Sequence, residues 1–158
     1  LTVCKEVAKD YPDIQVTDWY VDIMSANLIN PDMQSKFQVF VLPNLYGDII
    51  TDEAAQLQGG VGTAGSANTG SRYGMFEAIH GSAPRMIEEG LGAYANPSSI
   101  LKASEMLLRH IGMAEKANKL AKAMEECAAE GKVVVTGTKE GNTGKEYGDY
   151  LLEKLAKA

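Results

Sequence analysis

The sequence is poor in cysteine, histidine and tryptophan, which removes several classes of site. Its 158 residues include two cysteines, two histidines and one tryptophan. Cys4 and Cys127 lie far apart and match no Cys-x-x-Cys spacing, which argues against a zinc ribbon or a dithiol redox centre. We therefore expect two free thiols and a reducing, cytoplasmic location.

Long apolar runs and clusters of basic residues are also missing. The formal net charge is −6 and no Lys or Arg residues occur in runs, so we expect neither nucleic acid nor a membrane surface as a partner. No apolar segment approaches the roughly 20 residues that cross a bilayer, and charges within positions 1–10 argue against a signal peptide. The chain begins with Leu1 instead of Met, and we expect it to be a truncated or processed sequence.

The sequence does contain the alternating helix and strand patterns of an α/β protein. With 45% hydrophobic and 23% charged residues, it can form a sizeable core. Apolar spacing and β-branched runs predict helices and strands in alternation. The expected helices cover residues 1–9, 22–28, 47–57, 97–110, 114–130 and the segment from 143 onward, and the expected strands cover 14–21, 37–42, 74–79 and 132–136. A loop rich in Gly, Ala and Ser at 59–70 is the expected domain boundary.

One turn of a predicted helix carries two carboxylates on the same face. Asp48 and Asp52 are four residues apart, a spacing that makes side chains neighbours on a helix surface. A divalent cation would relieve their repulsion, and carboxylate oxygens suit Mg²⁺ or Mn²⁺. Taken alone, such a pair is more often the solvated face of a surface helix.

The residues around this pair favour the metal site. Pro-Asn-Leu-Tyr-Gly-Asp-Ile-Ile-Thr-Asp at 43–52 closely resembles the signature of the β-decarboxylating dehydrogenases, the isocitrate and isopropylmalate dehydrogenase family. The resemblance implies that Asp48 and Asp52 bind Mg²⁺ or Mn²⁺ together with a third aspartate from the partner subunit. Asp22 matches that third aspartate, although its place at a strand-to-helix transition also suits a helix N-cap.

A second segment is similar to the cofactor loop of the same family. It reads Glu-Ala-Ile-His-Gly-Ser-Ala-Pro at 77–84, and Ala-Asn-Pro at 95–97 matches the later adenine-contacting asparagine. The resemblance implies that the dinucleotide is bound by Glu77, His80, Gly81, Ser82, Ala83, Pro84, Arg85 and Asn96. Without the resemblance, the segment would be interpreted as an ordinary turn with a partly exposed histidine.

A Gly-x-Gly-x-x-Gly pattern at 60–65 is not interpreted as a dinucleotide fingerprint. The fingerprint requires a strand before it and a helix at its end, whereas here a predicted helix precedes it and more loop follows. The segment instead resembles a connection in the family, and Ala-Asn-Thr-Gly at 67–70 is more similar to isocitrate and homoisocitrate dehydrogenases than to isopropylmalate enzymes.

The choice between NAD and NADP depends on residues that point in different directions. Arg85 could pair with the 2′-phosphate of NADP, since a guanidinium suits phosphate recognition. NADP-using bacterial members also place Tyr and Arg after the last strand, where this sequence has Gly137 and Gly141. We therefore favour NAD and keep NADP as the alternative.

The resemblance implies a partial isopropylmalate dehydrogenase-like α/β fold. Residues 1–58 would belong to the small, dimerisation domain and residues 59–158 to the C-terminal part of the large, cofactor-binding domain of a homodimer or larger homo-oligomer. The implied reaction oxidises a small 2-hydroxy acid and removes its β-carboxylate, most simply isocitrate to 2-oxoglutarate. Alternatives are isopropylmalate, homoisocitrate or tartrate dehydrogenase, or a non-catalytic regulatory subunit. The family's catalytic lysine and tyrosine would lie upstream of Leu1, so no catalytic residue is assigned.

Overall fold

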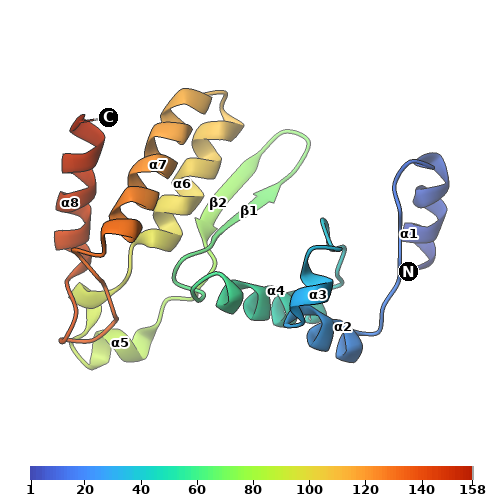
Figure 1. Cartoon of the computed structure of the whole chain (residues 1–158), viewed down its shortest axis with the longest axis horizontal. Coiled ribbons are helices and arrows are strands. Elements are labelled where there is room, and N and C mark those ends of the chain that lie inside the picture. Colours follow the sequence, from blue (N-terminus) through green and yellow to red (C-terminus); the bar gives the residue numbers. More distant parts are fainter. Residues whose placement is uncertain (158) are drawn as a thin grey trace. The chain divides into compact units, whose positions relative to one another are not determined.

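The computed structural model describes residues 1–157, which combine helices with a small sheet. The chain divides into two compact units, the first covering Leu1–Leu57 and the second beginning at Gln58. Among the described residues, no helix is both long enough and apolar enough to cross a membrane. Figure 1 shows the helices and strands of both units.

The first unit is helical. It contains α1 (Thr2–Val7) with a 3-10 turn at Ala8–Asp10, then α2 (Val21–Leu28), α3 (Pro31–Gln34) and α4 (Tyr46–Leu57). Asn30 caps α3, because its side chain accepts a hydrogen bond of 3.0 Å from the backbone N–H of Asp32. The core of the unit consists of Met24, Leu28 and Ile50, with Val21, Phe37, Leu42 and Ala54 packed against it. The helices expected over 22–28 and 47–57 are therefore confirmed.

The two strands expected in this unit, over residues 14–21 and 37–42, are absent. Both segments are irregular apart from the first residue of α2, and Val39 and Val41 are 82% and 79% exposed. The prediction was wrong because a strand needs a hydrogen-bonding partner as well as β-branched composition. The partner is a neighbouring backbone that accepts and donates the ladder hydrogen bonds, and the described unit offers none.

The second unit begins with an antiparallel hairpin. It pairs β1 (Gly65–Thr69) with β2 (Gly74–Ala78), in a register running from Gly65 opposite Ala78 to Thr69 opposite Gly74. The strand expected at 74–79 is confirmed, but residues 65–69 were expected to be loop. Their small side chains have a packing reason: a Cβ on Gly65 would lie 2.6 Å from the backbone N of Ala103. Glycine thus lets the hairpin lie directly against a helix.

Three helices, α6 (Ser98–His110), α7 (Ala114–Glu130) and α8 (Gly144–Lys157), lie side by side with the hairpin next to α6 (Figure 1). Two short elements, α5 (Pro84–Glu88) and η2 (Gly92–Tyr94), connect β2 to α6. The buried residues at the α7 and α8 interface are Ala123, Cys127, Tyr147 and Leu151. The predicted helices over 97–110 and 114–130 are confirmed.

A capping box forms the start of α8. The backbone N–H of Thr143 donates to the carboxylate of Glu146 at 2.6 Å, and the N–H of Glu146 donates to the hydroxyl of Thr143 at 3.2 Å. The two residues satisfy each other's backbone donors at the open end of the helix. The pKa of Glu146 is lowered because the backbone and hydroxyl of Thr143 both donate to its carboxylate.

The strand expected over Lys132–Thr136 is absent as well. The side chains of this segment still alternate between partly buried and exposed positions, since Val133 and Val135 pack on the core while Val134 is 51% exposed. The backbone of Val134 is satisfied by Asn142, which donates its N–H to the Val134 carbonyl at 2.9 Å and accepts the Val134 N–H at 3.0 Å. A loop residue thus occupies the place of a neighbouring strand in the described chain.

Candidate functional site

The candidate metal ligands of α4 follow a sharply turned entry to the helix. Leu45 has a φ of +70°, a left-handed conformation that branched residues avoid, and the next residue begins α4. The N–H of Gly47 donates to the carbonyl of Pro43 at 2.8 Å and closes the turn. This conformation presents the first turn of α4, with Asp48 in it, to solvent.

Asp48 and Asp52 lie one turn apart on α4, and both are exposed. Four residues of helix correspond to about 6 Å along the axis. Between residues 1 and 157, neither carboxylate has an ion-pair partner, whereas the nearby hydroxyl of Thr51 is bound to the helix backbone at Gly47. The two carboxylates are therefore free to share a cation.

Asp22 lies apart from this pair. It occupies the first turn of α2, where its carboxylate accepts the N–H of Ile23 at 2.8 Å. The N-cap position belongs to Tyr20, so the alternative role of Asp22 as the cap does not apply. No three His, Cys, Asp or Glu residues of the described chain are grouped closely enough to hold a metal ion.

The predicted cofactor segment extends from β2 into an exposed loop. Glu77, on β2, accepts a hydrogen bond of 2.8 Å from the side-chain amide of Asn68 on β1. Ring atom Nδ1 of His80 lies 2.9 Å from the carbonyl oxygen of Gly81. Because a carbonyl only accepts, Nδ1 carries the proton, and Nε2 of a neutral ring remains an acceptor.

The end of the loop holds an unusual backbone conformation. Ala83 has a φ of +46° and directly precedes Pro84, the first residue of α5. Leu45 and Ala83 are the two non-glycine residues with positive φ between residues 1 and 157, and each lies in one of the two segments singled out in the sequence. Strained backbone of this kind concentrates at binding and catalytic sites, which supports a functional role for both segments.

Arg85 is largely exposed and already paired. Its side chain is 87% exposed, and its Nε donates to the carboxylate of Glu89 at 2.7 Å. Gly137 and Gly141 occupy the positions where NADP-using bacterial members place Tyr and Arg, and the backbone favours glycine at both. Gly137 has a φ of +81°, and a Cβ on Gly141 would lie 2.9 Å from the backbone N of Thr136. A larger side chain at either position would strain this loop.

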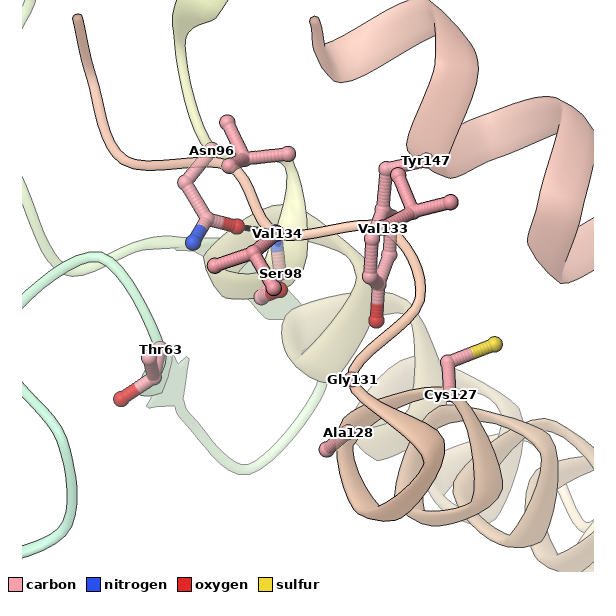
Figure 2. Close-up of a pocket in the computed structure, with 10 residues that line it drawn as sticks. Thr63, Asn96, Ser98, Cys127, Ala128, Gly131, Val133, Val134 and Tyr147 are labelled. Atoms are coloured by element: carbon pink, nitrogen blue, oxygen red, sulfur yellow. Dashed lines mark hydrogen bonds between the residues drawn. The ribbon is translucent and has the colours of Figure 1, made fainter. Parts of the chain in front are cut away.

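Asn96 lines a cavity of about 220 Å³ in the second unit (Figure 2). The side-chain oxygen Oδ1 of Asn96 accepts the backbone N–H of Ser98, at the start of α6, at 2.9 Å. The cavity wall consists of Thr63, Asn96, Ser98, Cys127, Ala128, Gly131, Val133, Val134, Val135 and Tyr147. His80 and Arg85 are not part of this wall, so the structure brings only one of the predicted cofactor residues to the cavity.

Burial favours the neutral form of two titratable groups of the wall. Desolvation raises the pKa of the Cys127 thiol, and it also raises the pKa of the Tyr147 phenol. Cys127 is 1% exposed, so it behaves as an apolar core residue and not as a nucleophile.

Sequence reasoning missed two polar residues of this region. Asn68 holds the carboxylate of Glu77, and Ser99, fully buried at the start of α6, contacts both the residue before β1 and the residue after β2. Nothing in the sequence distinguishes Ser99 from an ordinary first-turn serine, because its partners are backbone groups 35 and 20 residues away.

Known proteins match most of this chain. Residues 1–149 match the family described as isocitrate/isopropylmalate dehydrogenase. The chain is 44% identical over 130 residues to a 3-isopropylmalate dehydrogenase from Archaeoglobus fulgidus, covering 82% of this chain and 38% of that protein. It is 42% identical over 147 residues to an NADP isocitrate dehydrogenase from Rickettsia felis, covering 92% of this chain and 29% of that protein.

A solved structure gives the same result. The crystal structure of isocitrate dehydrogenase from Methylococcus capsulatus matches with a TM-score of 0.87 and 33% identity, covering 98% of this chain and 44% of that one. The chain thus spans less than half the length of these relatives. The matched fold and both signature segments lead to one conclusion: the chain belongs to the isocitrate/isopropylmalate dehydrogenase family.

Proposed function

We propose that the protein containing this chain is a metal-dependent dehydrogenase that oxidises and decarboxylates a 2-hydroxy acid, with isocitrate as the leading substrate and 2-oxoglutarate as its product. The observation that carries this proposal is the pair of exposed, uncommitted carboxylates of Asp48 and Asp52, one turn apart on α4 within the family's signature segment.

The donor set on α4 fits a hard divalent cation. Two carboxylates on one turn provide the oxygen ligands that Mg²⁺ and Mn²⁺ prefer, with further positions left to water or substrate. A cation bound there supplies Lewis-acid polarisation of the substrate's oxygen atoms. Asp48 and Asp52 hold it from one subunit, and Asp22 of the second subunit completes the ligand set in a homodimer, which explains why the three do not cluster within one chain.

The dinucleotide is assigned to the loop that follows β2. His80 offers Nε2 as an acceptor, and the backbone from Gly81 to Pro84 is exposed and fixed by the conformation of Ala83. Asn96 is assigned to the same dinucleotide, because its Nδ2 remains available while its side-chain oxygen accepts the N–H of Ser98. Glu77 and Arg85 flank the loop and contribute side chains to it.

We propose NAD as the preferred dinucleotide. The guanidinium of Arg85 is engaged by Glu89, and the backbone at Gly137 and Gly141 disfavours the larger side chains of a 2′-phosphate clamp. NADP remains the alternative because the similar Rickettsia felis protein is named an NADP enzyme.

The substrate is the least determined part of the proposal. Relatives of similar identity are named 3-isopropylmalate dehydrogenase and isocitrate dehydrogenase. The Ala-Asn-Thr-Gly segment favours isocitrate, and Asn68 of that segment contacts Glu77 at the start of the cofactor loop. Homoisocitrate and tartrate are further alternatives, as is a non-catalytic regulatory subunit. The intact acidic residues argue against the regulatory role.

Two free thiols support a cytoplasmic location.

A substrate panel tests this proposal. The full-length protein is supplied with Mg²⁺, each dinucleotide, and isocitrate, homoisocitrate, isopropylmalate or tartrate in turn, and reduced cofactor is followed by absorbance. We expect the highest kcat/KM with isocitrate and NAD. A preference for another acid would reassign the substrate, and no turnover of any acid would favour the regulatory subunit.

A further inference from the structure

The hydroxyl of Ser99 occupies the end of the β1–β2 ladder. Ser99 is 0% exposed. Its Oγ accepts the backbone N–H of Ile79 at 3.1 Å and donates to the backbone carbonyl of Ala64. A single side-chain atom therefore connects the residue that precedes β1 with the residue that follows β2.

The hairpin register shows which pair of residues this hydroxyl bridges. The N–H of Gly70 donates to the carbonyl of Tyr73 at 2.8 Å, so these two residues form a hydrogen-bonded pair next to the turn. Such pairs recur at every second position of an antiparallel ladder. Continued through the observed register, the alternation makes Ala64 and Ile79 the next hydrogen-bonded pair beyond Gly65 and Ala78. At this position the hydroxyl of Ser99 bridges the two backbone groups.

The bridge lies where three segments of the candidate site meet. Ile79 is followed at once by His80, and Ala64 is preceded by the cavity-lining Thr63. Ser99 itself lies three residues after Asn96. Ser99 thus connects the residue before β1 with the residue at which the cofactor loop leaves β2.

The surrounding packing makes the position of this oxygen definite. Gly65, beside Ala64, approaches α6 so closely that a Cβ would lie 2.6 Å from the N of Ala103. The contacts of β1 and β2 with α6 therefore hold both backbone partners against the helix that carries Ser99. A buried bridge of this kind has little freedom to adjust.

We propose that Ser99 is a positioning residue for dinucleotide binding, acting through Ile79 on the His80–Pro84 loop and through its own helix on Asn96. This inference rests on the proposed dinucleotide site. Ser99 does not touch the cofactor. Without its hydroxyl, the N–H of Ile79 and the carbonyl of Ala64 lose a part-buried hydrogen-bond partner, and the loop is no longer joined to α6 at this point.

The test uses the full-length protein and two matched variants. Ser99→Ala removes the bridge, whereas Ser104→Ala removes a hydroxyl of the same helix whose bond is local, to the carbonyl of Ile100 at 2.8 Å. Dinucleotide Kd is measured by titration, KM and kcat are measured for cofactor and for acid substrate, and Tm is measured for each protein. Assays are run well below the lowest Tm.

We expect Ser99→Ala to raise the Kd and KM for the dinucleotide by about five- to 100-fold, the range expected when a contact group is displaced by up to about 1 Å. The KM for the metal-bound acid should change less than twofold, and Ser104→Ala should change neither constant. A purely structural role would lower Tm and leave the dinucleotide constants of the folded enzyme unchanged.

If Ser99→Ala does not fold, Ser99→Cys provides the same test, because a thiol keeps a weak donor and acceptor in a similar volume. Its dinucleotide KM should rise by a smaller factor than that expected for alanine. Dinucleotide constants within twofold of wild type in a folded Ser99 variant would overturn the inference. A wild-type protein that turns over a 2-hydroxy acid but loses nothing in Ser99→Ala refutes the positioning role alone. A wild-type protein that binds no dinucleotide refutes both proposals.

Discussion

Nε of Arg85 lies 2.7 Å from Oε1 of Glu89, one helical turn further along the chain. The pair lies at the end of the predicted cofactor loop, and it engages the only cationic side chain of residues 77–85. A guanidinium held in this way is less available to a 2′-phosphate than a free one. We therefore expect the pair to affect cofactor preference in the proposed enzyme.

Glu89→Gln should shift cofactor preference toward NADP. An exposed ion pair is worth about 0.2–1 kcal/mol, which corresponds to a change of up to about fivefold in the ratio of kcat/KM for NADP to that for NAD. Glu88→Gln is the matched control, because Glu88 is an exposed neighbour without that pairing. An unchanged ratio in Glu89→Gln, or an equal change in both variants, would show that the pair does not restrain Arg85.

Leu151→Ala should destabilise the second unit far more than Leu152→Ala. Leu151 is 3% exposed in the core between α7 and α8, while its neighbour Leu152 is 64% exposed. Truncating a buried leucine costs about 2–5 kcal/mol, whereas an exposed substitution stays within about 0.5 kcal/mol. Urea unfolding of the two variants measures the difference. Similar losses in both would contradict the assignment of α8's buried face.

Glu130 should make stability depend on pH in the acid range. Hydrogen bonds from Lys154, Tyr150 and Lys132 lower the pKa of its carboxyl from 4.5 to about 2. A lowered folded-state pKa stabilises the protein above the unfolded value, and that contribution is lost as pH falls toward the folded value. The difference in unfolding free energy between wild type and Glu130→Gln should thus be constant above about pH 4.5 and shrink toward pH 2.

The matched control for Glu130 is Glu126→Gln on the same helix. Nζ of Lys122 and Oε1 of Glu126 lie 3.9 Å apart, and both side chains are largely exposed. Their ion pair should therefore contribute little to the unfolding free energy at any pH. Urea unfolding across the acid range compares the variants. A Glu130→Gln difference that is independent of pH, or no larger than that of Glu126→Gln, would contradict the role of the cluster.

An element of the fold could be predicted from sequence when the residues that stabilise it lie within the element itself. The helices at 114–130 and 47–57 were predicted well, since apolar spacing and capping residues lie within the element. Strands require a partner that the local sequence does not specify, which is why 37–42 and 132–136 were predicted wrongly and β1 was taken for loop.

The candidate site shows the same division. The metal and cofactor segments could be located because each is a continuous run of residues, from 43 to 52 and from 77 to 85. Ser99 and Asn68 could not, because their importance comes from contacts with residues distant in sequence. The burial of Ser99 also depends on the close approach of Gly65 to α6, a property of the folded chain alone.

Mixing two inactive variants should restore activity if each site is shared between subunits. Full-length Asp22→Asn and Asp48→Asn chains are co-expressed with different tags, and the mixed dimer is purified. One of its two sites then has every proposed ligand, so a random mixture should recover about a quarter of wild-type activity and the purified mixed dimer about half. Mixed dimers without activity would show that Asp22 does not act across the interface.

Metal-dependent turnover tests the proposed function most directly. The full-length protein is assayed with isocitrate and NAD after chelation, after restoring Mg²⁺ or Mn²⁺, and as the Asp48→Asn variant, with Asp32→Asn as an exposed control in the same unit. We expect turnover to disappear on chelation and return with the cation. It should fall in Asp48→Asn by more than the roughly 10- to 100-fold typical of losing a residue that only orients a metal ligand, and stay unchanged in Asp32→Asn. Full turnover without metal, or in Asp48→Asn, would contradict the assignment of α4 as the metal-binding helix.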